Sequence, residues 1–133
     1  MKSYLKNEKG EFMTESLISE AEIKEIDNYL RGYALNMKLL RLDRYERTYL
    51  GYRDGEDCPF NDAPLARARM FEIRHFIMEM KNSDEKLLLY YHYVRGESVE
   101  KCAELLGISR SSAFRLKKKA LILAVRMKTG TAT

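Results

Sequence analysis

Apolar residues recur at alternating steps of three and four in two separate stretches of this chain, which is the spacing of a helix that packs against another helix. The two rows are Ile23, Ile26, Leu30, Tyr33, Met37 and Leu40, and then Ala66, Met70, Ile73, Ile77 and Met80. They predict two helices that either fold back on one another as a hairpin or pair with a second chain. Core packing is a simpler explanation for both rows than a dedicated partner-binding groove.

The ends of these two helices carry recognisable signals. Ser19 followed by Glu22 is typical of a capping box, so the first helix should span about residues 19–49. The segment 51–63 contains two glycines, a proline and four acidic residues, which is typical of a loop. Pro64 then suits the first turn of the second helix. The acidic residues of the loop, Asp54, Glu56, Asp57 and Asp62, lack the order of a calcium-binding loop.

Three shorter helices are predicted in the rest of the chain. Ser83 is a good N-cap for a helix that should end near Gly96. A second helix is expected over residues 98–106, and a third from Ser109, as its N-cap, to about Lys128. No stretch has the alternation of a strand.

The predicted fold class is therefore all-α. We expect a long N-terminal helix or helical hairpin in residues 1–82, followed by a three-helix domain in residues 83–128. Residues 129–133 are small and polar and are predicted to form a disordered tail.

Residue types at four positions match the requirements of a helix-turn-helix. Ala103 is small enough for two helices to cross closely, Gly107 tolerates a left-handed turn, and Ala113 and Leu116 can face inward. Ile108 can fill the angle between the helices. An ordinary αα-hairpin is the alternative. The helix-turn-helix is favoured because these types coincide with two N-cap serines and a wholly basic second helix.

Positive charge is concentrated near the C-terminus. The chain has a net charge of +4, but residues 107–133 contain seven basic residues and no acidic residue, and residues 1–106 carry a net charge of −3. A concentrated basic segment attracts a polyanion. Charge alone fits a solvated basic tail equally well, so the inference of DNA binding depends on its combination with the helix-turn-helix pattern.

One stretch of the chain resembles region 4 of bacterial sigma factors, the part that reads the −35 promoter element. It reads YYHYVRGESVEKCAELLGISRSSAFRLKKKAL and covers about a quarter of the chain. Within the class of sigma-70 region 4-like proteins, it is similar to the phage late-transcription regulators of the ArpU and RinA type. The N-terminal part matches that group in length and pattern only. The resemblance implies a sigma region 4-like domain that binds DNA.

The resemblance implies that Arg110, Ser111, Phe114 and Arg115 face the bases, and that Lys119 faces the DNA backbone. The inward stripe of the helix independently places the first four on its outer side. The full predicted DNA-binding set is Ser109, Arg110, Ser111, Ser112, Phe114, Arg115, Lys117, Lys118 and Lys119. Either arginine can contact guanine bidentately. The three lysines cannot all face one groove, because successive helical residues turn by about 100°.

Phe114 departs from the sigma pattern, in which this position is usually polar. Two roles are open for it. It can contact a thymine methyl group, or it can pack against the N-terminal region of its own chain.

The sequence offers no arrangement typical of an enzyme or a metalloprotein. Cys58 and Cys102 form no CxxC pair, and the only histidines are His75 and His92, so no zinc site is expected. Cys102 is predicted to be a small core residue of the helix-turn-helix, and His92 is predicted to be a packed or half-exposed neighbour of the core. No apolar leader and no membrane-length apolar run is present. We therefore expect no cofactor, no metal, no catalysis and no membrane contact, in a soluble cytoplasmic protein.

These features predict a sequence-specific, double-stranded DNA-binding regulator of transcription, from a phage or mobile element, whose recognition helix enters the major groove. A homodimer on two half-sites is expected, with residues 23–40 and 66–80 as the place to look for its interface. RNA polymerase is an open second partner. Two other classes also stay open: a DNA-packaging module like a small terminase subunit, and a polymerase- or sigma-binding adaptor. Tyrosines and arginines near residues 44–53 could contact nucleic acid or a partner, but a solvated helix end is favoured there.

Overall fold

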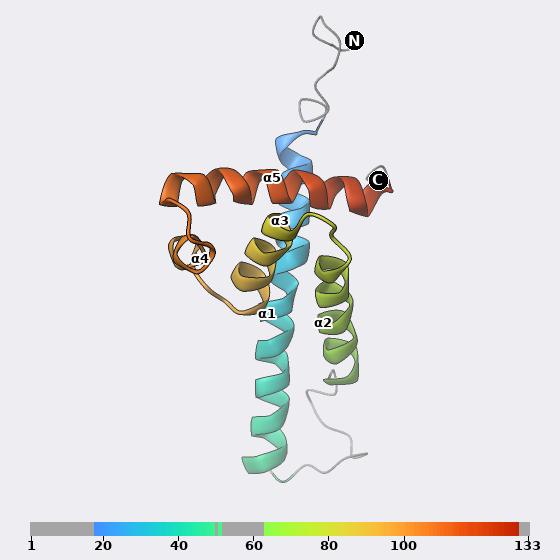
Figure 1. Ribbon diagram of the computed structural model, residues 1–133. Coiled ribbons are helices and arrows are strands. Elements are labelled where there is room, and N and C mark those ends of the chain that lie inside the picture. The colour runs from blue at the N-terminus through green and yellow to red at the C-terminus, as the bar shows by residue number, and fades with distance from the viewer. Residues whose placement is uncertain (1–17, 50, 52–62, 131–133) are drawn as a thin grey trace, which may run out of the picture.

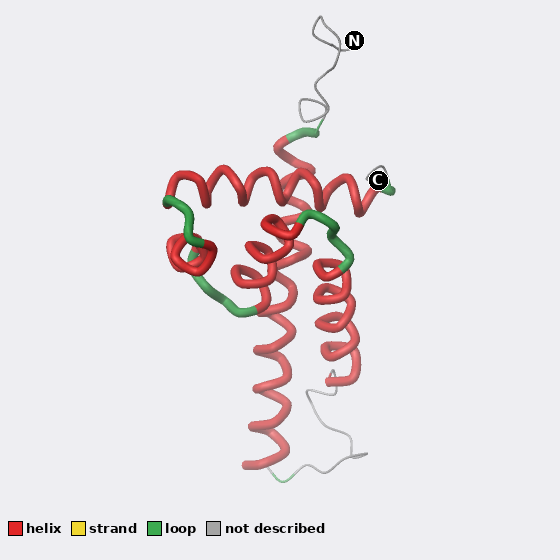
Figure 2. Tube along the Cα trace, in the orientation of Figure 1, coloured by secondary structure: helices red, strands yellow, loops and turns green. Residues whose placement is uncertain are grey.

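The computed structural model describes residues 18–49, 51 and 63–130, and almost all of them are helical (Figures 1 and 2). The helices are α1 (Glu20–Tyr49), α2 (Ala63–Met78), α3 (Ser83–Leu89), α4 (Val99–Leu106) and α5 (Arg110–Thr129). A π-helical turn, η2 (Tyr90–Val94), continues α3. The described residues contain no strand, so the all-α prediction is confirmed.

α1 begins with the predicted capping box. The Ser19 backbone N donates to Glu22 Oε1 at 2.9 Å, and the Glu22 backbone N donates to Ser19 Oγ at 3.1 Å. These two bonds satisfy amide groups that the first turn of a helix leaves without partners. The thirty-residue helix that follows is the longest element of the fold.

The two predicted apolar rows pack against each other within one chain, and α1 and α2 lie side by side (Figure 1). Ile26, Leu30, Ile73 and Ile77 are at most 4% exposed. A Cβ atom on Gly32 would lie 3.3 Å from Ile73 Cδ1, so glycine permits a close approach of the helices here. The hairpin alternative therefore holds. A single chain already buries or half-buries these rows, so in this arrangement they are not free to pair with a second chain. The predicted homodimer itself stays a prediction.

The buried side of α1 also contains two polar residues, one before Leu40 and one after it. Asn36 and Asp43 are buried, and each bonds within its own helix. Asn36 Nδ2 donates to the Gly32 carbonyl at 2.7 Å, and Arg47 Nε donates to Asp43 Oδ2 at 3.0 Å. These short-range bonds let polar side chains occupy the face that the apolar spacing alone assigns to the core.

One hydrophobic core extends across the boundary that the sequence suggested near residue 82. It includes Leu30 from α1, Ile77 from α2, Leu88 from α3 and Ala124 from α5. α5 crosses over the N-terminal part of α1, and α4, seen end-on in Figure 1, packs at the N-terminal end of α5. The C-terminal helices thus share their core with the helical hairpin.

The helix from residue 83 differs in detail from its prediction. Asn82, not Ser83, is the N-cap, and its side chain makes no capping bond. Acidic residues do occupy the first turn, at Asp84 and Glu85, where the helix dipole favours them. The helix ends in the π-helical turn and then at Gly96, whose φ of 75° fits the predicted end of the helix.

Several predictions concern residues outside the described ranges. They are the acidic loop residues and Cys58, and most of the predicted tail. Thr129 is an exception, because it is the last residue of α5 and not part of a tail. The helix is then capped by Gly130, which is left-handed.

Candidate nucleic-acid interface

A three-residue turn joins α4 to α5, and its geometry follows from its residue types. Gly107 has φ 71° and ψ 33°, a left-handed conformation that glycine adopts without steric cost. The Ile108 backbone N donates to the Ala103 carbonyl at 3.0 Å, which closes the end of α4. The predicted glycine turn is therefore confirmed.

Serine N-caps begin both helices of this pair. Ser98 Oγ accepts a hydrogen bond from the Lys101 backbone N at 3.1 Å, and Ser109 Oγ accepts one from the Ser112 backbone N at 3.1 Å. A cap of this kind is worth about 1 kcal/mol and fixes the residue at which a helix starts. The caps thereby fix the register of the side chains that α5 presents.

Small residues let α4 and α5 approach closely. Val99, Ala103 and Ala113 form a separate buried cluster, in which Ala113 is fully buried. Cys102 is fully buried in the main core, as predicted for a small packed residue. Ile108 is 37% exposed and belongs to neither buried cluster, so it is only partly covered beside the turn.

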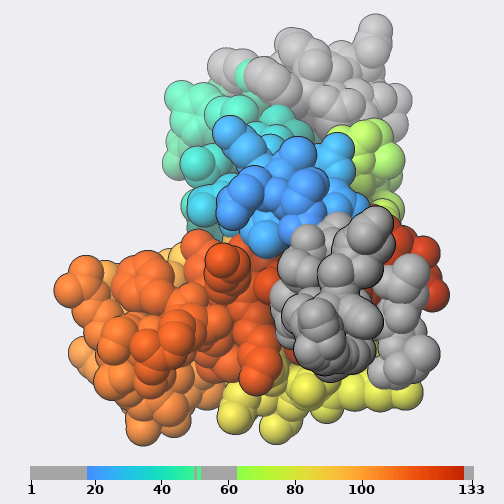
Figure 3. Space-filling model, turned by 90° about the horizontal axis from the view of Figure 1, so that it is seen from above, coloured from blue at the N-terminus to red at the C-terminus, as the bar shows by residue number. Residues whose placement is uncertain are grey.

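The two halves of α5 have different surroundings. In the C-terminal half, Ala120, Leu121, Ala124 and Val125 belong to the main core. In the N-terminal half, Ala113 and Arg110 contact α4, and Leu116 packs against the edge of the main core. Figure 3 shows α5 from above, with α4 at its N-terminal end and the first turns of α1 alongside.

The outer face of α5 contains most of the predicted site residues. Those exposed are Ser109, Arg110, Ser111, Phe114, Arg115, Lys118 and Lys119. Ser112 is half-buried beside its capping bond. α5 contains no acidic residue. Hydroxyl, guanidinium and ammonium donors therefore line one side of a helix that is fixed on its other side.

Arg110 is held by two neighbours. Its Nε donates to Glu100 Oε2 at 3.2 Å, and its guanidinium lies 5.8 Å from the centre of the Phe114 ring. Phe114 is 45% exposed, and it is absent from both buried clusters and from the half-buried shell around the main core. Phe114 thus has no place in the core formed by the described part of the N-terminal region, residues 18–49, 51 and 63–82, and both of its predicted roles stay predictions. Glu100 was missed because nothing in the spacing signals a contact across the turn.

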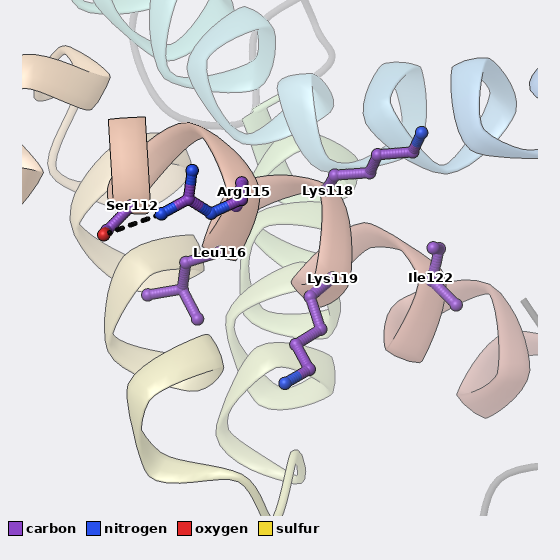
Figure 4. Close-up of a pocket in the computed structure, with 6 residues that line it drawn as sticks. All are labelled: Ser112, Arg115, Leu116, Lys118, Lys119 and Ile122. Carbon is purple, nitrogen blue, oxygen red and sulfur yellow. Dashed lines mark hydrogen bonds between the residues drawn. The ribbon is translucent and has the colours of Figure 1, made fainter. Parts of the chain in front are cut away.

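Arg115 borders an open hollow on α5 of about 580 Å³ (Figure 4). Arg115 Nη2 donates to Ser112 Oγ at 3.2 Å. Leu116 and Ile122 are the apolar residues that line the hollow. Figure 4 also shows that Lys118 and Lys119 extend in different directions from the helix. The basic side chains around this hollow can contact phosphate groups, and its small apolar surface can contact the apolar parts of nucleotides.

Lys117 is turned away from this face. It is half-buried, and its charge acts on Asp27 of α1 and on His92 of η2. Burial lowers the pKa of His92 below its ordinary value, and the charges of Lys117 and Arg31 lower it further. The structure thus separates Lys117 from the rest of the predicted set.

Asp27 joins α1 to the π-helical turn. It accepts hydrogen bonds from Tyr93 Oη and from Arg31 Nε. Burial would raise the pKa of Asp27, but these two bonds and the charge of Lys117 bring the pKa below its usual value. Burial, followed by the bond to Asp27, raises the pKa of Tyr93. The network fixes the turn that precedes α4.

Nowhere in residues 18–49, 51 and 63–130 do three or more His, Cys, Asp or Glu side chains gather closely enough to hold a metal ion. None of the helices in the described parts of the chain combines the length and the apolar content that crossing a bilayer requires.

Comparisons with known proteins complete the description. No protein-family model, no curated protein and no solved structure matches the chain. The resemblance to sigma region 4 therefore stays a prediction, and it depends on residues 90–121 alone.

Proposed function

We propose that this chain binds double-stranded DNA sequence-specifically through the N-terminal half of α5, and that it regulates transcription. One observation carries the proposal: the exposed side of a helix without acidic residues presents Arg110, Ser111, Phe114, Arg115 and Lys118, while its other side is fixed by α4 and the core. The major groove of B-DNA admits a single α-helix of this kind.

The residues divide into two roles by their chemistry. Arg110 and Arg115 have planar guanidinium groups, which can donate two hydrogen bonds to guanine O6 and N7. Lys118 and Lys119 point in different directions, so at least one of them reaches a phosphate and not a base edge. The exposed ring of Phe114 fits a thymine methyl group.

The regulatory part of the proposal comes from the resemblance to sigma region 4 and to phage late-transcription regulators. In such a protein, base contacts position the chain at a promoter, and the remaining surface recruits or assists RNA polymerase. The helical hairpin of α1 and α2, which contains the longest described helix, is where we propose such a contact.

The test is selection of bound sequences from random double-stranded DNA by the purified chain, followed by affinity measurements on the selected site. Arg110→Ala and Arg115→Ala should each weaken binding by roughly 1–3 kcal/mol and relax the sequence preference at one position. Arg69→Ala is the matched control, because Arg69 is an exposed arginine on α2. It should leave the affinity for the selected site unchanged.

Three outcomes would count against the proposal. If the selected DNA sequences share no consensus, the claim of sequence-specific binding is wrong. If Arg69→Ala weakens DNA binding as much as Arg110→Ala and Arg115→Ala do, the exposed face of α5 is not the DNA-binding surface. Failure to bind any DNA would favour an adaptor that contacts polymerase or a sigma factor, and a ring-sized oligomer on DNA would favour a packaging module.

A further inference from the structure

α1 carries a second row of residues with heptad spacing, on the side opposite the seam with α2. The row is Arg31, Leu35, Lys38, Leu42, Tyr45 and Tyr49, which we call the outer stripe of α1; its steps alternate between four and three. Its four apolar members are Leu35, Leu42, Tyr45 and Tyr49, with 58%, 46%, 56% and 71% exposed. Single exposed apolar residues are normal, but an aligned row of them is typical of an interaction surface.

One end of the outer stripe borders other elements that the structure describes. There, Arg31, Leu35 and Lys38 line a hollow of about 510 Å³ together with residues 96–98. At the other end, the rings of Tyr45 and Tyr49 contact each other with centroids 4.8 Å apart. The tyrosine pair is therefore ordered on the helix, with most of its surface open to a partner.

We infer that the outer stripe binds the outer stripe of a second copy of this chain, with the two α1 helices antiparallel. A row that alternates steps of three and four fits a helix with the same repeat, since both keep their apolar sides in register over several turns. A twofold dimer needs one surface that is complementary to itself, and a single stripe on one helix meets that condition. The pairing does not depend on DNA binding and goes beyond the proposed function.

Charge decides the orientation. A parallel pair would place Lys38 against Lys38 and Arg31 against Arg31, and such like-charge contacts oppose association. An antiparallel pair centred between Leu42 and Tyr45 overlaps along residues 38–49 of each outer stripe and brings Lys38 level with Tyr49 of the second copy. It also places Lys38 within one turn of Glu46 of the second copy.

Lys38 is exposed, whereas Glu46 is half-buried, and its Oε1 atom is buried without a hydrogen-bond partner. A rotation of the Glu46 side chain towards the second copy would give this oxygen a partner in Lys38. The ammonium group of Lys38 can pair with the carboxylate of Glu46 and also lie over the ring of Tyr49 of the second copy. Twofold symmetry makes each contact occur twice.

The experiment is sedimentation velocity of the full chain, without DNA, over a range of concentrations. The unmodified chain should dimerise, and Leu42→Glu should be monomeric. Lys38→Glu and Glu46→Lys should each raise the dimer dissociation constant about tenfold, because each change creates two like-charge contacts. The double variant with both reversals should restore the affinity of the unmodified chain.

Phe71→Glu is the matched control, because Phe71 is 68% exposed but lies on α2. It should dimerise like the unmodified chain. Circular dichroism and thermal melts show whether each variant is folded, and the charge variants change only side chains outside the core. A monomeric unmodified chain, which would leave the stripe to a different protein, overturns the inference. Unchanged or tighter dimerisation of Lys38→Glu would also overturn it, because that result fits a parallel pair. A double variant that does not recover the affinity of the unmodified chain would overturn it as well.

Since these measurements contain no DNA, their outcome is separate from that of the proposed function. A chain that dimerises but binds no DNA would contradict only the function. A chain that binds its site as a monomer and never dimerises would contradict only the inference.

Discussion

Arg110 Nε lies 3.2 Å from Glu100 Oε2, so the first residue of α5 is paired with the second residue of α4. Their side chains are 72% and 50% exposed, and an ion pair this accessible to water adds little to stability. The pair instead places a carboxylate beside an arginine that is proposed to contact DNA. Glu100 and the nucleic acid would compete for the same guanidinium group.

We predict that Glu100→Gln tightens binding to the selected DNA site by about 1 kcal/mol or less, which is up to about fivefold. The substitution removes a negative charge near the phosphates and frees Arg110. Fluorescence anisotropy with labelled DNA measures the effect. Glu104→Gln is the control, because Glu104 is an exposed acid on the same helix that pairs with Lys101. Weaker binding of Glu100→Gln would mean that the pair positions Arg110 for its contact.

The lysines should differ from the arginines in how salt affects binding. Lys118→Ala and Lys119→Ala should lower affinity by similar factors on specific and nonspecific DNA. The lysine that contacts a phosphate should also reduce the slope of log K against log salt concentration by about 1. Titrations at several salt concentrations give the slope. Lys117→Ala is the comparison, since Lys117 faces Asp27 and His92, and a larger change of slope there would contradict the orientation described.

Gly107→Ala should destabilise the fold through backbone strain. The left-handed φ of 71° costs a residue with a Cβ atom about 1–2 kcal/mol, and no atom within 4 Å would clash with that Cβ. Chemical denaturation gives the change in the free energy of unfolding. Gly107→Asn should cost less than Gly107→Ala, because asparagine tolerates this conformation better. Equal costs would point to a cause other than the backbone angle.

Ala113→Leu should disrupt the contact between α4 and α5. Ala113 is fully buried against Val99 and Ala103, so added methyl groups must push the helices apart, at a cost of about 1–3 kcal/mol. Thermal or chemical denaturation measures the loss. Ala68→Leu makes the same change at an exposed position of α2 and should be nearly neutral. A neutral Ala113→Leu would mean that the two helices do not approach closely in solution.

The half-buried His92 should make stability depend on pH near neutrality. Burial lowers its pKa below the ordinary value of 6.5, and its Nδ1 donates to the Glu97 carbonyl at 2.7 Å. As the pH falls below about 6.5, the unfolded chain takes up a proton that the folded chain resists, so stability is lost towards acid pH.

Melting temperatures on either side of pH 6.5 measure this loss. His92→Gln should reduce the difference between the two temperatures relative to the unmodified chain. The same substitution at His75, which is exposed on α2, controls for removal of an imidazole group. If His92→Gln leaves the difference unchanged, other groups are responsible for the pH dependence.

The parts of the fold that local rules decide could be predicted from the sequence. Ser19, Ser98 and Ser109 cap helices through bonds to residues three positions ahead, and Gly107 forms its turn because few other residues tolerate that angle. The hairpin follows from two matching apolar rows, although the rows alone left open whether the partner was the same chain.

What the sequence could not predict depends on contacts between distant residues. The π-helical turn at Tyr90–Val94 accompanies a bond from Tyr93 to Asp27, which lies 66 residues away. The direction of Lys117 depends on where α1 crosses α5, and the pairing of Glu100 with Arg110 depends on how α4 meets α5. A periodic pattern identifies one face of a helix but not the element that covers it.

α5 is one continuous helix of twenty residues with two tasks. Its N-terminal half is proposed to recognise DNA, and its C-terminal half is part of the main core. A screen for loss of DNA recognition should therefore return two classes of alleles. Changes at Arg110 or Arg115 would leave a folded protein that cannot read its site. Larger residues at Ala120 or Ala124 would give a temperature-sensitive protein, because they would disturb the core and so shift the whole of α5.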